Sequence, residues 1–391
     1  MKEVKTIGYD AKRIVSNATG LGSYSRTLLE SLANYDKQFL LYAPNKGRKE
    51  LYSSLLEKEN LFFKFPHKSN GDLVSNKILQ WLWREEGVVD DLLKDKVEVF
   101  HGLTGQLPKG IKQSGIKSIV TIHDLIFFPH PEWYSKIDVF LYKKKFFRTI
   151  KQADRIIAIS ECTKRDIIRY GNVDERKIEV IYQSYNPIFS QEISQEEKQK
   201  VKQKYSLPEK FILNVGTIER RKNALLAVKA LKEIILNNPK TEEHLVIVGR
   251  KTSYAKEIEH YIEQNGLTDR VHIINGVLFD ELKVLYSLAD LFVYPSIYEG
   301  FGIPIIEAIA NRLPVVACKG SCLEEAGGEH SLYVEPTDVK AMAEAMQTLL
   351  CNEKKRTLVI EKGLQHIQKF ANNDVAQKHI QLYNQLINNQ Y

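Results

Sequence analysis

The sequence predicts an α/β protein built from two doubly wound parallel sheets. Short apolar runs alternate with helical patterns along the whole of the 391 residues, which is typical of parallel strands joined by crossover helices. The alternation restarts at Phe211, after a polar stretch at 191–198 that packs no obvious core. We therefore expect one domain at 1–190, a second at 191–370, and a C-terminal helix at 371–391 that packs back on the first domain.

The first half contains seven strand-like apolar runs, at 4–9, 39–42, 61–65, 97–100, 118–122, 156–159 and 178–182. Apolar residues at helical spacing predict helices at 24–32, 137–151 and 163–170. The polar stretch at 191–198 indicates a linker or a surface helix.

The second half begins with a strand-like run at 211–216. Five more follow, at 245–248, 271–274, 291–293, 315–317 and 332–334, with helical patterns between most of them. The tail at 375–387 also has helical spacing. Because open parallel sheets bind ligands at the carboxyl ends of their strands, we expect a site in a crevice between the domains.

The composition is that of an ordinary soluble protein, with 43% apolar and 27% charged residues. The first residues contain no apolar signal-peptide core, and no apolar run is long enough to span a membrane, so we expect a cytoplasmic protein. Four cysteines are scattered, without a metal-binding spacing, and we expect free thiols in a reducing compartment: Cys162, Cys318, Cys322 and Cys351.

The net charge of +7 lies entirely in the first half. Residues 1–190 contain 31 Lys and Arg against 23 Asp and Glu, whereas the remainder contains 25 against 26. This asymmetry indicates an anionic partner for the first half, either a membrane surface or a phosphate-bearing acceptor. No nucleic-acid-binding module is evident, so we expect no nucleic-acid partner.

The most informative motif is the stretch at 294–307, where seven residues separate Glu299 from Glu307 across a glycine-containing turn. A buried strand precedes the turn, and Pro304 suits the first position of a helix after it. The N–H groups at the start of a helix bind phosphate, and the two carboxylates could accept bonds from sugar hydroxyls. A sugar nucleotide fits this combination. The alternative is that both carboxylates are simply solvated, because a strand, a glycine turn and a helix occur in any doubly wound domain.

Basic residues follow the strand at 211–216. Arg221 and Lys222 are side by side there, which suits a diphosphate, since Arg offers a bidentate fork and Lys a point charge. The alternative, a solvated basic turn, is favoured for Arg220. In the first half, Gly22 follows the first strand and His123 ends another; either of these has an ordinary structural interpretation as well.

With these motifs in place, the chain resembles the retaining GT-B glycosyltransferases of family 4 over nearly its full length. The segments that carry the resemblance are Gly216-Thr-x-Glu-x-Arg-Lys-Asn223, Pro295-Ser-x-x-Glu-Gly-Phe-Gly-x-Pro-x-x-Glu-Ala308, Leu313-Pro-Val-Val-Ala317, Glu325-Ala-Gly327, Glu335-Pro336, Gly20-x-Gly22 and His123-Asp-Leu125. The resemblance implies a GT-B fold, in which two Rossmann-like domains line a central cleft.

The resemblance also implies roles for individual residues. Glu299 would bind hydroxyls of the transferred hexose, Glu307 the ribose, and Arg221 with Lys222 the diphosphate, while His123 would lie near the hexose on the acceptor side. The other positions implied in donor binding are Gly22, Gly216, Thr217, Gly249, Lys251, Val277, Phe301, Gly302 and Ile303. Of these, Gly302 and Ile303 would donate N–H groups to the phosphate, Gly22 would lie under the diphosphate, and Val277 with 249–251 would line the base pocket.

One residue departs from the family pattern: Thr217 stands where many members have Arg, so Arg221 and Lys222 must carry more of the phosphate charge. The chain has no Asp-x-Asp pair, so the usual ligands of a metal bridging the diphosphate are lacking. We expect the basic residues to replace the ion, with no cofactor and no metal.

The implied function is the retaining transfer of a hexose from GDP-mannose or a UDP-hexose to a glycan or lipid-linked acceptor in surface polysaccharide or glycolipid synthesis. His123-Asp-Leu125 and His130-Pro-Glu-Trp133 resemble mannosyltransferase-like members and favour GDP-mannose. The alternatives are an epimerase or a phosphorylase on the same fold, and a sugar-nucleotide-binding protein without catalysis.

The stretch at 142–148 interleaves lysines with aromatic residues, and Trp81 and Trp83 add aromatic surface. Peripheral contact of the basic first half with the inner face of the cytoplasmic membrane is one interpretation. The other, which we favour from sequence, places Phe146, Phe147 and both Trp side chains in the core and leaves the lysines solvated.

Overall fold

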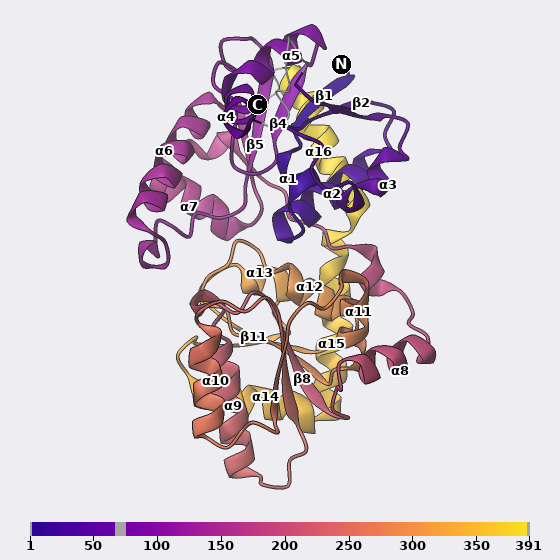
Figure 1. Cartoon of the computed structure of the whole chain (residues 1–391), viewed down its shortest axis with the longest axis vertical. Helices are drawn as coiled ribbons and strands as arrows, with labels where there is room; N and C mark the ends of the chain where they lie inside the picture. Colours follow the sequence, from indigo (N-terminus) through magenta and orange to yellow (C-terminus); the bar gives the residue numbers. More distant parts are fainter. Residues whose placement is uncertain (1, 67–75, 389–391) are drawn as a thin grey trace. The chain divides into compact units, whose positions relative to one another are not determined.

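The computed structural model describes residues 2–66 and 76–388. By its internal contacts the chain divides into two compact units (Figure 1). Unit 1 comprises Met1–Ser184 and Phe370–Tyr391, and unit 2 comprises Tyr185–Lys369.

The described part of unit 1 contains a parallel sheet of seven strands, one for each run expected from the sequence. In spatial order they are β3 (Leu61–Lys64), β2 (Gln38–Tyr42), β1 (Thr6–Asp10), β4 (Val99–Gly102), β5 (Lys117–Ile122), β6 (Arg155–Ala158) and β7 (Ile178–Val180). The helices of this unit are α1 (Lys12–Ser16), α2 (Gly20–Leu32), α3 (Ser53–Leu56), α4 (Lys77–Leu82), α5 (Val88–Lys94), α6 (Lys136–Gln152), α7 (Glu161–Gly171) and α16 (Asn372–Ile387). A π-helical turn, Trp83–Gly87, joins α4 to α5.

The chain returns to unit 1 at its end, where α16 packs against α2. Val375, Ile380 and Tyr383 of α16 lie in the same buried cluster as Leu28 of α2. The hydroxyl of Tyr383 also meets the buried ring nitrogen Nδ1 of His101 at 2.8 Å. Apolar burial together with this internal polar contact therefore fixes the last helix on the first sheet.

Unit 2 contains a parallel sheet of six strands, again one for each expected run. Their spatial order is β10 (Val271–Ile274), β9 (His244–Val248), β8 (Phe211–Val215), β11 (Leu291–Tyr294), β12 (Val315–Cys318) and β13 (Leu332–Val334). The helices are α8 (Gln195–Lys204), α9 (Ala224–Asn237), α10 (Ala255–Gln264), α11 (Phe279–Leu288), α12 (Ile303–Ala310), α13 (Leu323–Gly327), α14 (Val339–Cys351) and α15 (Glu353–Ile367). Short 3-10 turns occur in the chain at Lys49–Leu51, Pro131–Trp133, Glu175–Lys177, Pro187–Ser190, Arg220–Lys222 and Gln368–Phe370.

The prediction of two Rossmann-like parallel sheets is confirmed. The polar stretch for which a linker or a surface helix was expected leads into α8, which Ser194 and Glu197 begin with a reciprocal capping box. Each sheet reverses its strand order once, between β1 and β4 in unit 1 and between β8 and β11 in unit 2. At such a switch point the loops leave in opposite directions and open a space for a ligand at the carboxyl ends of the strands.

The structure corrects the favoured interpretation of the aromatic residues around α6 and α4. Phe146 is buried as expected, but Phe147 and Trp81 are exposed and Trp83 is half-buried. The buried side of α6 runs through Phe146, Thr149 and Ile150. Successive residues of a helix point about 100° apart, so Phe147 falls outside this side. Among the described residues, no helix is long and apolar enough to cross a membrane.

Candidate functional site

Doubly wound sheets bind ligands at their switch point, and in unit 2 that point brings together the two motifs predicted from sequence. The strands β8 and β11 are hydrogen-bonded neighbours. The turn Arg220–Lys222 follows β8, and the turn that contains Glu299 follows β11. The amide of Ile297 donates to the carbonyl of Arg221 at 2.9 Å and holds the two turns together.

Three charged side chains from these turns form one ion cluster. Arg221 Nη1 lies 2.7 Å from Glu299 Oε2, and Lys222 Nζ lies 2.5 Å from Glu299 Oε1. The Lys222 ammonium also donates to the hydroxyl of Tyr294 at 2.6 Å, and a second Arg221 nitrogen binds Glu219 at 2.8 Å. Glu299 is only 8% exposed. Both of its oxygens are therefore engaged by cations in a partly desolvated place.

The cluster keeps all three groups charged. Burial alone would raise the pKa of Glu299, but the charges of Lys222 and Arg221 outweigh it and lower the pKa to about 2. Burial would likewise lower the pKa of Lys222, yet the nearby Glu299 carboxylate raises it above the usual value. The site thus holds two cations that no ordinary pH can neutralise.

The turn after β11 ends at Gly302, whose φ of 115° lies in the region that favours glycine. A Cβ there would also lie 3.1 Å from Leu323 Cδ2. The helix α12 begins at Ile303, one residue before the expected start at Pro304, so Pro304 occupies its second position. Pro304 fits this position too, because the first N–H groups of a helix lack intrahelical acceptors.

The buried thiol of Cys322 supports the same turn. Its Sγ lies 3.1 Å from the carbonyl oxygen of Glu299 and 3.0 Å from that of Phe301, whose side chain is buried. One side chain therefore contacts both the Glu299–Gly300 and the Phe301–Gly302 peptide groups.

Glu307 lies on α12 in a different environment from Glu299. It is 9% exposed, and its Oε2 accepts a hydrogen bond from the Tyr286 hydroxyl of α11 at 3.1 Å. Burial raises the pKa of Glu307 to about 7, and the bond from Tyr286 opposes only part of that rise. One carboxylate of the pair is thus permanently ionised, while the other titrates near neutral pH.

The remaining predicted positions of unit 2 lie at neighbouring strand ends. Gly216 and Thr217 follow β8, Gly249 and Lys251 follow β9, and Val277 follows β10. The amide of Gly216 donates to Val248 at 2.9 Å, and that of Gly249 donates to Ile274 at 3.0 Å. Lys251 is exposed and pairs with Glu259 at 2.6 Å. These turns share the sheet edge that carries the ion cluster.

Arg220, by contrast, pairs with Glu257 at 2.6 Å, and 67% of its side chain is exposed. It lies away from the cluster formed by its neighbours Arg221 and Lys222. This arrangement agrees with its interpretation as a solvated residue.

Two predicted residues, Gly22 and His123, belong to unit 1. Gly22 lies in the first turn of α2, where a Cβ would come within 1.9 Å of the Asn17 carbonyl oxygen. His123 follows β5, and its Nε2 meets the Leu103 carbonyl at 2.7 Å, so this nitrogen carries the hydrogen. Its Nδ1 accepts from the Gln183 amide at 2.8 Å. Burial lowers the pKa of His123 to about 4, so the ring is neutral.

His123 lines a cavity of about 370 Å³ in unit 1. The wall comes from the switch point of the first sheet and from α6: Arg13, Leu21, Thr104, Gly105, Gln106, Ile122, Asp124, Leu125, Phe127, Tyr134, Tyr142, Lys145 and Phe146. Aromatic rings, two cations (Arg13 and Lys145) and one carboxylate (Asp124) therefore surround a neutral histidine. Such a lining suits a polar ligand that carries sugar rings or negative charge.

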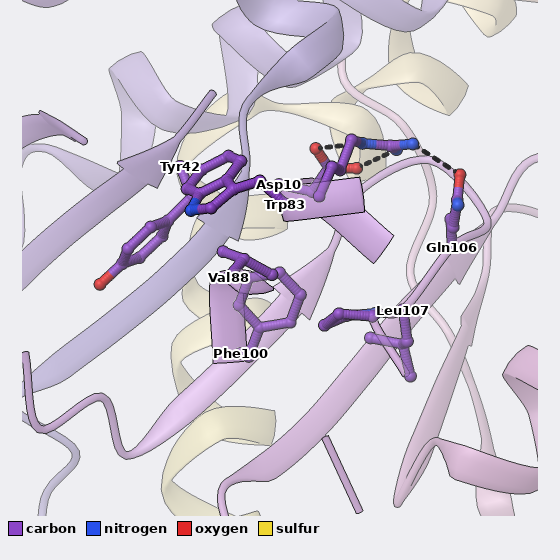
Figure 2. A pocket seen from close by; sticks show the side chains of 9 residues that line it. Asp10, Tyr42, Trp83, Val88, Phe100, Gln106 and Leu107 are labelled. Carbon is purple, nitrogen blue, oxygen red and sulfur yellow. Dashed lines mark hydrogen bonds and ion pairs between the residues drawn. The ribbon is translucent and has the colours of Figure 1, made fainter. Parts of the chain in front are cut away.

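A buried polar network supports this part of unit 1. In Figure 2 the labelled Asp10 and Gln106 are joined through one guanidinium, which belongs to Arg84. Asp10 ends β1, and Arg84 Nε donates to it at 3.1 Å while Arg84 Nη1 donates to Gln106 at 2.8 Å. The Gln106 amide in turn donates to the buried Glu85, which binds Arg148 of α6 at 2.8 Å. The network ties β1, the π-helical turn and α6 into one rigid frame.

Sequence reasoning missed Tyr294, Tyr286 and Cys322, together with the cavity residues Arg13 and Lys145. Tyr294 carried a signal, because a polar aromatic residue ended an otherwise apolar strand. The others come from elements distant in sequence, and no local pattern marks them. Among the described residues, no group of three or more His, Cys, Asp or Glu side chains is arranged to hold a metal ion.

Two family models match the chain. "Glycosyl transferases group 1" matches residues 195–366, and "Glycosyltransferase Family 4" matches residues 18–187. Together they cover most of both units.

Among curated proteins, the chain is 33% identical over 230 residues to the O-antigen chain mannosyltransferase RfbU of Salmonella typhimurium, covering 59% of this chain and 60% of that one. It is 27% identical over 274 residues to O-antigen chain mannosyltransferase B of Escherichia coli, covering 70% of each. The match to the serotype-specific mannosyltransferase WbdA of Escherichia coli, at 30% identity, spans only 29% of that larger protein.

Solved structures share the fold across the full length. A glycosyltransferase from Rickettsia africae superposes with a TM-score of 0.74 at 18% identity and complete coverage of both chains. HepE of Anabaena, in complex with UDP and glucose, superposes with a TM-score of 0.73 at 19% identity, covering 97% of this chain and 99% of that one. At these identities the likeness establishes the GT-B arrangement of strands and helices.

Proposed function

Because the chain belongs to the group 1 and family 4 glycosyltransferases, we propose that it transfers a hexose from a nucleotide-diphosphate sugar to a glycan or lipid-linked acceptor. The ion cluster of Glu299, Arg221 and Lys222 carries this proposal. Arg221 and Lys222 offer fixed positive charge for the diphosphate, and Glu299 offers a carboxylate for the hydroxyls of the sugar.

Cleavage of that bond develops negative charge on the departing diphosphate and positive charge on the anomeric carbon. Cations that are already in place stabilise the leaving group more strongly as it departs, which lowers the barrier. Arg221 and Lys222 are held by Glu299 and Tyr294 at 2.5–2.7 Å, so little reorganisation is needed. The N–H groups at Gly302 and Ile303, at the positive end of α12, would add to the same field.

The donor that we favour is GDP-mannose, with a UDP-hexose as the alternative. Three relatives named above are mannosyltransferases, whereas the HepE structure contains UDP and glucose. Glu307 would accept bonds from the ribose hydroxyls. The turns at Gly216–Thr217 and Gly249–Lys251, with Val277, would surround the base.

The resemblance to retaining glycosyltransferases implies that the anomeric configuration is retained, and we propose the same here. Both Glu299 oxygens are engaged by cations and the pKa of this carboxyl is about 2, so Glu299 is a poor nucleophile. Direct displacement on one face then remains: the bond from the anomeric carbon to the diphosphate breaks, the bond to the acceptor oxygen forms, and the acceptor proton passes to the departing phosphate. Proton NMR of the product tests this step, and an inverted anomeric centre would overturn it.

The reaction is proposed to need no metal ion. Arg221 and Lys222 supply two permanent charges where other enzymes place a bridging cation. The acceptor is a growing surface polysaccharide or a glycolipid, extended on the cytoplasmic side of the cytoplasmic membrane. The O-antigen relatives support this class of acceptor.

The deciding experiment measures nucleoside diphosphate release from a panel of GDP- and UDP-sugars, with thermal unfolding of the protein in each donor. A bound donor raises the melting temperature by mass action, and slow hydrolysis in water reveals chemistry without the acceptor. GDP-mannose is expected to do both. Stabilisation without any release would favour a binding protein, appearance of an epimeric donor would favour an epimerase, and no response to any donor would refute the proposal.

A further inference from the structure

The helix α6 of unit 1 presents apolar side chains away from the core. Ile137 is 73% exposed and Phe140 is 65% exposed, and Leu141 and Phe147 are exposed as well. The residues that α6 buries are Phe146, Thr149 and Ile150. We call the exposed residues Ile137, Phe140, Leu141, Lys144, Phe147 and Lys151 the outer face of α6.

The outer face is contiguous and does not consist of isolated side chains. Residues three and four positions apart are neighbours on a helix, so Ile137, Phe140 and Leu141 form one apolar patch, with Lys144 on the next turn. Single exposed apolar residues are common on soluble proteins, but a grouped patch bordered by charge marks an interaction surface. The packing of α6 on unit 1 does not explain why these exposed residues are apolar, because the opposite side of the helix already packs against the core.

The charge on α6 is strongly one-sided. The helix carries six Lys or Arg residues and one acidic residue, Asp138. Lys136, Lys144, Lys145 and Lys151 are exposed, and none forms an ion pair with any residue in 2–66 or 76–388. This helix lies in the half of the chain that carries the whole net positive charge. Its partner must therefore be both anionic and able to accept apolar side chains.

From this combination we infer that the outer face of α6 docks on an anionic lipid leaflet, with Ile137, Phe140 and Leu141 in the interfacial region and the lysines on the headgroups. Amphipathic helices that lie in a membrane interface have this pairing of apolar residues with Lys and Arg. A second copy of the chain fits the surface poorly, because two such faces would bring their lysines together.

A second group of exposed apolar side chains lies elsewhere in unit 1. The helix α4 is also apolar on its surface, with Ile78 and Leu82 exposed and Trp81 51% exposed. The π-helical turn that continues α4 contains Glu85, and the 2.8 Å ion pair of Glu85 with Arg148 anchors that turn to α6. The π-helical turn thus links α4, which carries a second group of exposed apolar side chains, to α6.

Docking would also place the unit 1 cavity close to the lipid. Tyr142, Lys145 and Phe146 of α6 form part of its wall. This step rests on the proposed function: the acceptor is a lipid-linked glycan presented by the membrane that α6 contacts. The cations Arg13 and Lys145 would meet its phosphate groups.

The test is sedimentation of the full chain with vesicles of phosphatidylcholine alone or mixed with phosphatidylglycerol, without any donor sugar. We expect binding to the anionic vesicles only, and its loss between about 50 mM and about 500 mM salt, where charges are screened. The variant Lys144→Glu/Lys151→Glu should weaken the partition coefficient by more than about twentyfold, since each cation near an anionic leaflet contributes about fivefold. Ile137→Ser/Phe140→Ser should weaken it similarly.

The matched control is Lys354→Glu/Leu358→Ser on α15 of unit 2, where both residues are exposed. It should bind vesicles as the wild type does, and all variants should keep the wild-type melting temperature and donor hydrolysis. No sedimentation of the wild type with anionic vesicles at low salt would overturn the inference, as would equal losses in the control. Loss of a dimer in the Ile137→Ser/Phe140→Ser variant, measured by light scattering, would assign the face to a second copy instead. Because vesicle binding is read without sugar transfer, its failure is distinct from failure of the proposed function.

Discussion

Replacing Lys222 by Ala tests the ion cluster most directly. The Lys222 ammonium lies 2.5 Å from Glu299 and 2.6 Å from the Tyr294 hydroxyl, and 16% of its side chain is exposed. Loss of one preorganised donor to a developing charge costs about 2.7–4 kcal/mol of transition-state stabilisation, or about 100- to 1,000-fold in turnover. The variant should therefore lose at least about a hundredfold in kcat.

The same change should cost some stability, since Glu299 stays buried with Arg221 as its remaining cationic partner. A buried charge that loses one hydrogen-bonding partner typically costs about 1–3 kcal/mol. Thermal unfolding and donor binding measured beside kcat separate this effect from lost chemistry. The fall in kcat must appear at temperatures where the variant is fully folded.

Arg220→Ala is the matched control, because it removes a cation only two residues away. Arg220 pairs with Glu257 at the surface, and such pairs contribute about 0–1 kcal/mol. Its kcat should stay within about twofold of the wild type, as expected for a surface change. Near-normal turnover in Lys222→Ala, or an equal fall in Arg220→Ala, would refute the assignment of the leaving-group site.

Three further results are expected. The pKa of Glu307 is raised to about 7, so its carboxylate ionises as the pH rises through 7. Calorimetry should therefore find donor binding about tenfold weaker at pH 6 than at pH 8. The variant Glu307→Gln should bind the donor weakly at both pH values, and an unchanged pH dependence in that variant would assign the titration to another group. On the folding side, the raised pKa means that Glu307 stabilises the protein below its unfolded pKa and that this contribution is lost as the pH rises through 7. Gly302→Ala introduces a Cβ at φ 115°, and this backbone strain costs about 1–3 kcal/mol of stability. The variant should therefore have a lower melting temperature and a lower turnover. A fully stable, fully active variant would show that the turn tolerates a side chain. Transfer should survive EDTA, whereas complete loss that magnesium or manganese restores would contradict the proposal of a metal-independent reaction.

The positions of the site residues along the chain were accessible from sequence because parallel sheets obey strict rules. Within residues 2–66 and 76–388, apolar runs of strand length predicted each strand of the two sheets. Turn residues after these runs predicted Arg221, Lys222 and Glu299 at strand ends. The helix that follows Gly302 was also predicted, but it begins at Ile303, one residue before the expected start. Their roles in donor binding remain proposals that the experiments above address.

Other features depend on which elements become neighbours. Local periodicity did not reveal that the outer face of α6 is apolar, because a helix with apolar residues on two sides gives the same composition as a buried one. The cavity of unit 1 brings together Arg13 and Lys145, and Tyr286 reaches Glu307 from a different helix.

By itself the sequence determined the two sheets, the turns that carry charge and the glycine that α12 needs at its start, since these depend on local pattern and backbone sterics. Only the tertiary structure decided that Glu299 bridges both cations while Glu307, on the same motif, is buried beside Tyr286. The physical reason is that a pKa depends on desolvation and on charges brought close by long-range strand pairing, here β8 beside β11.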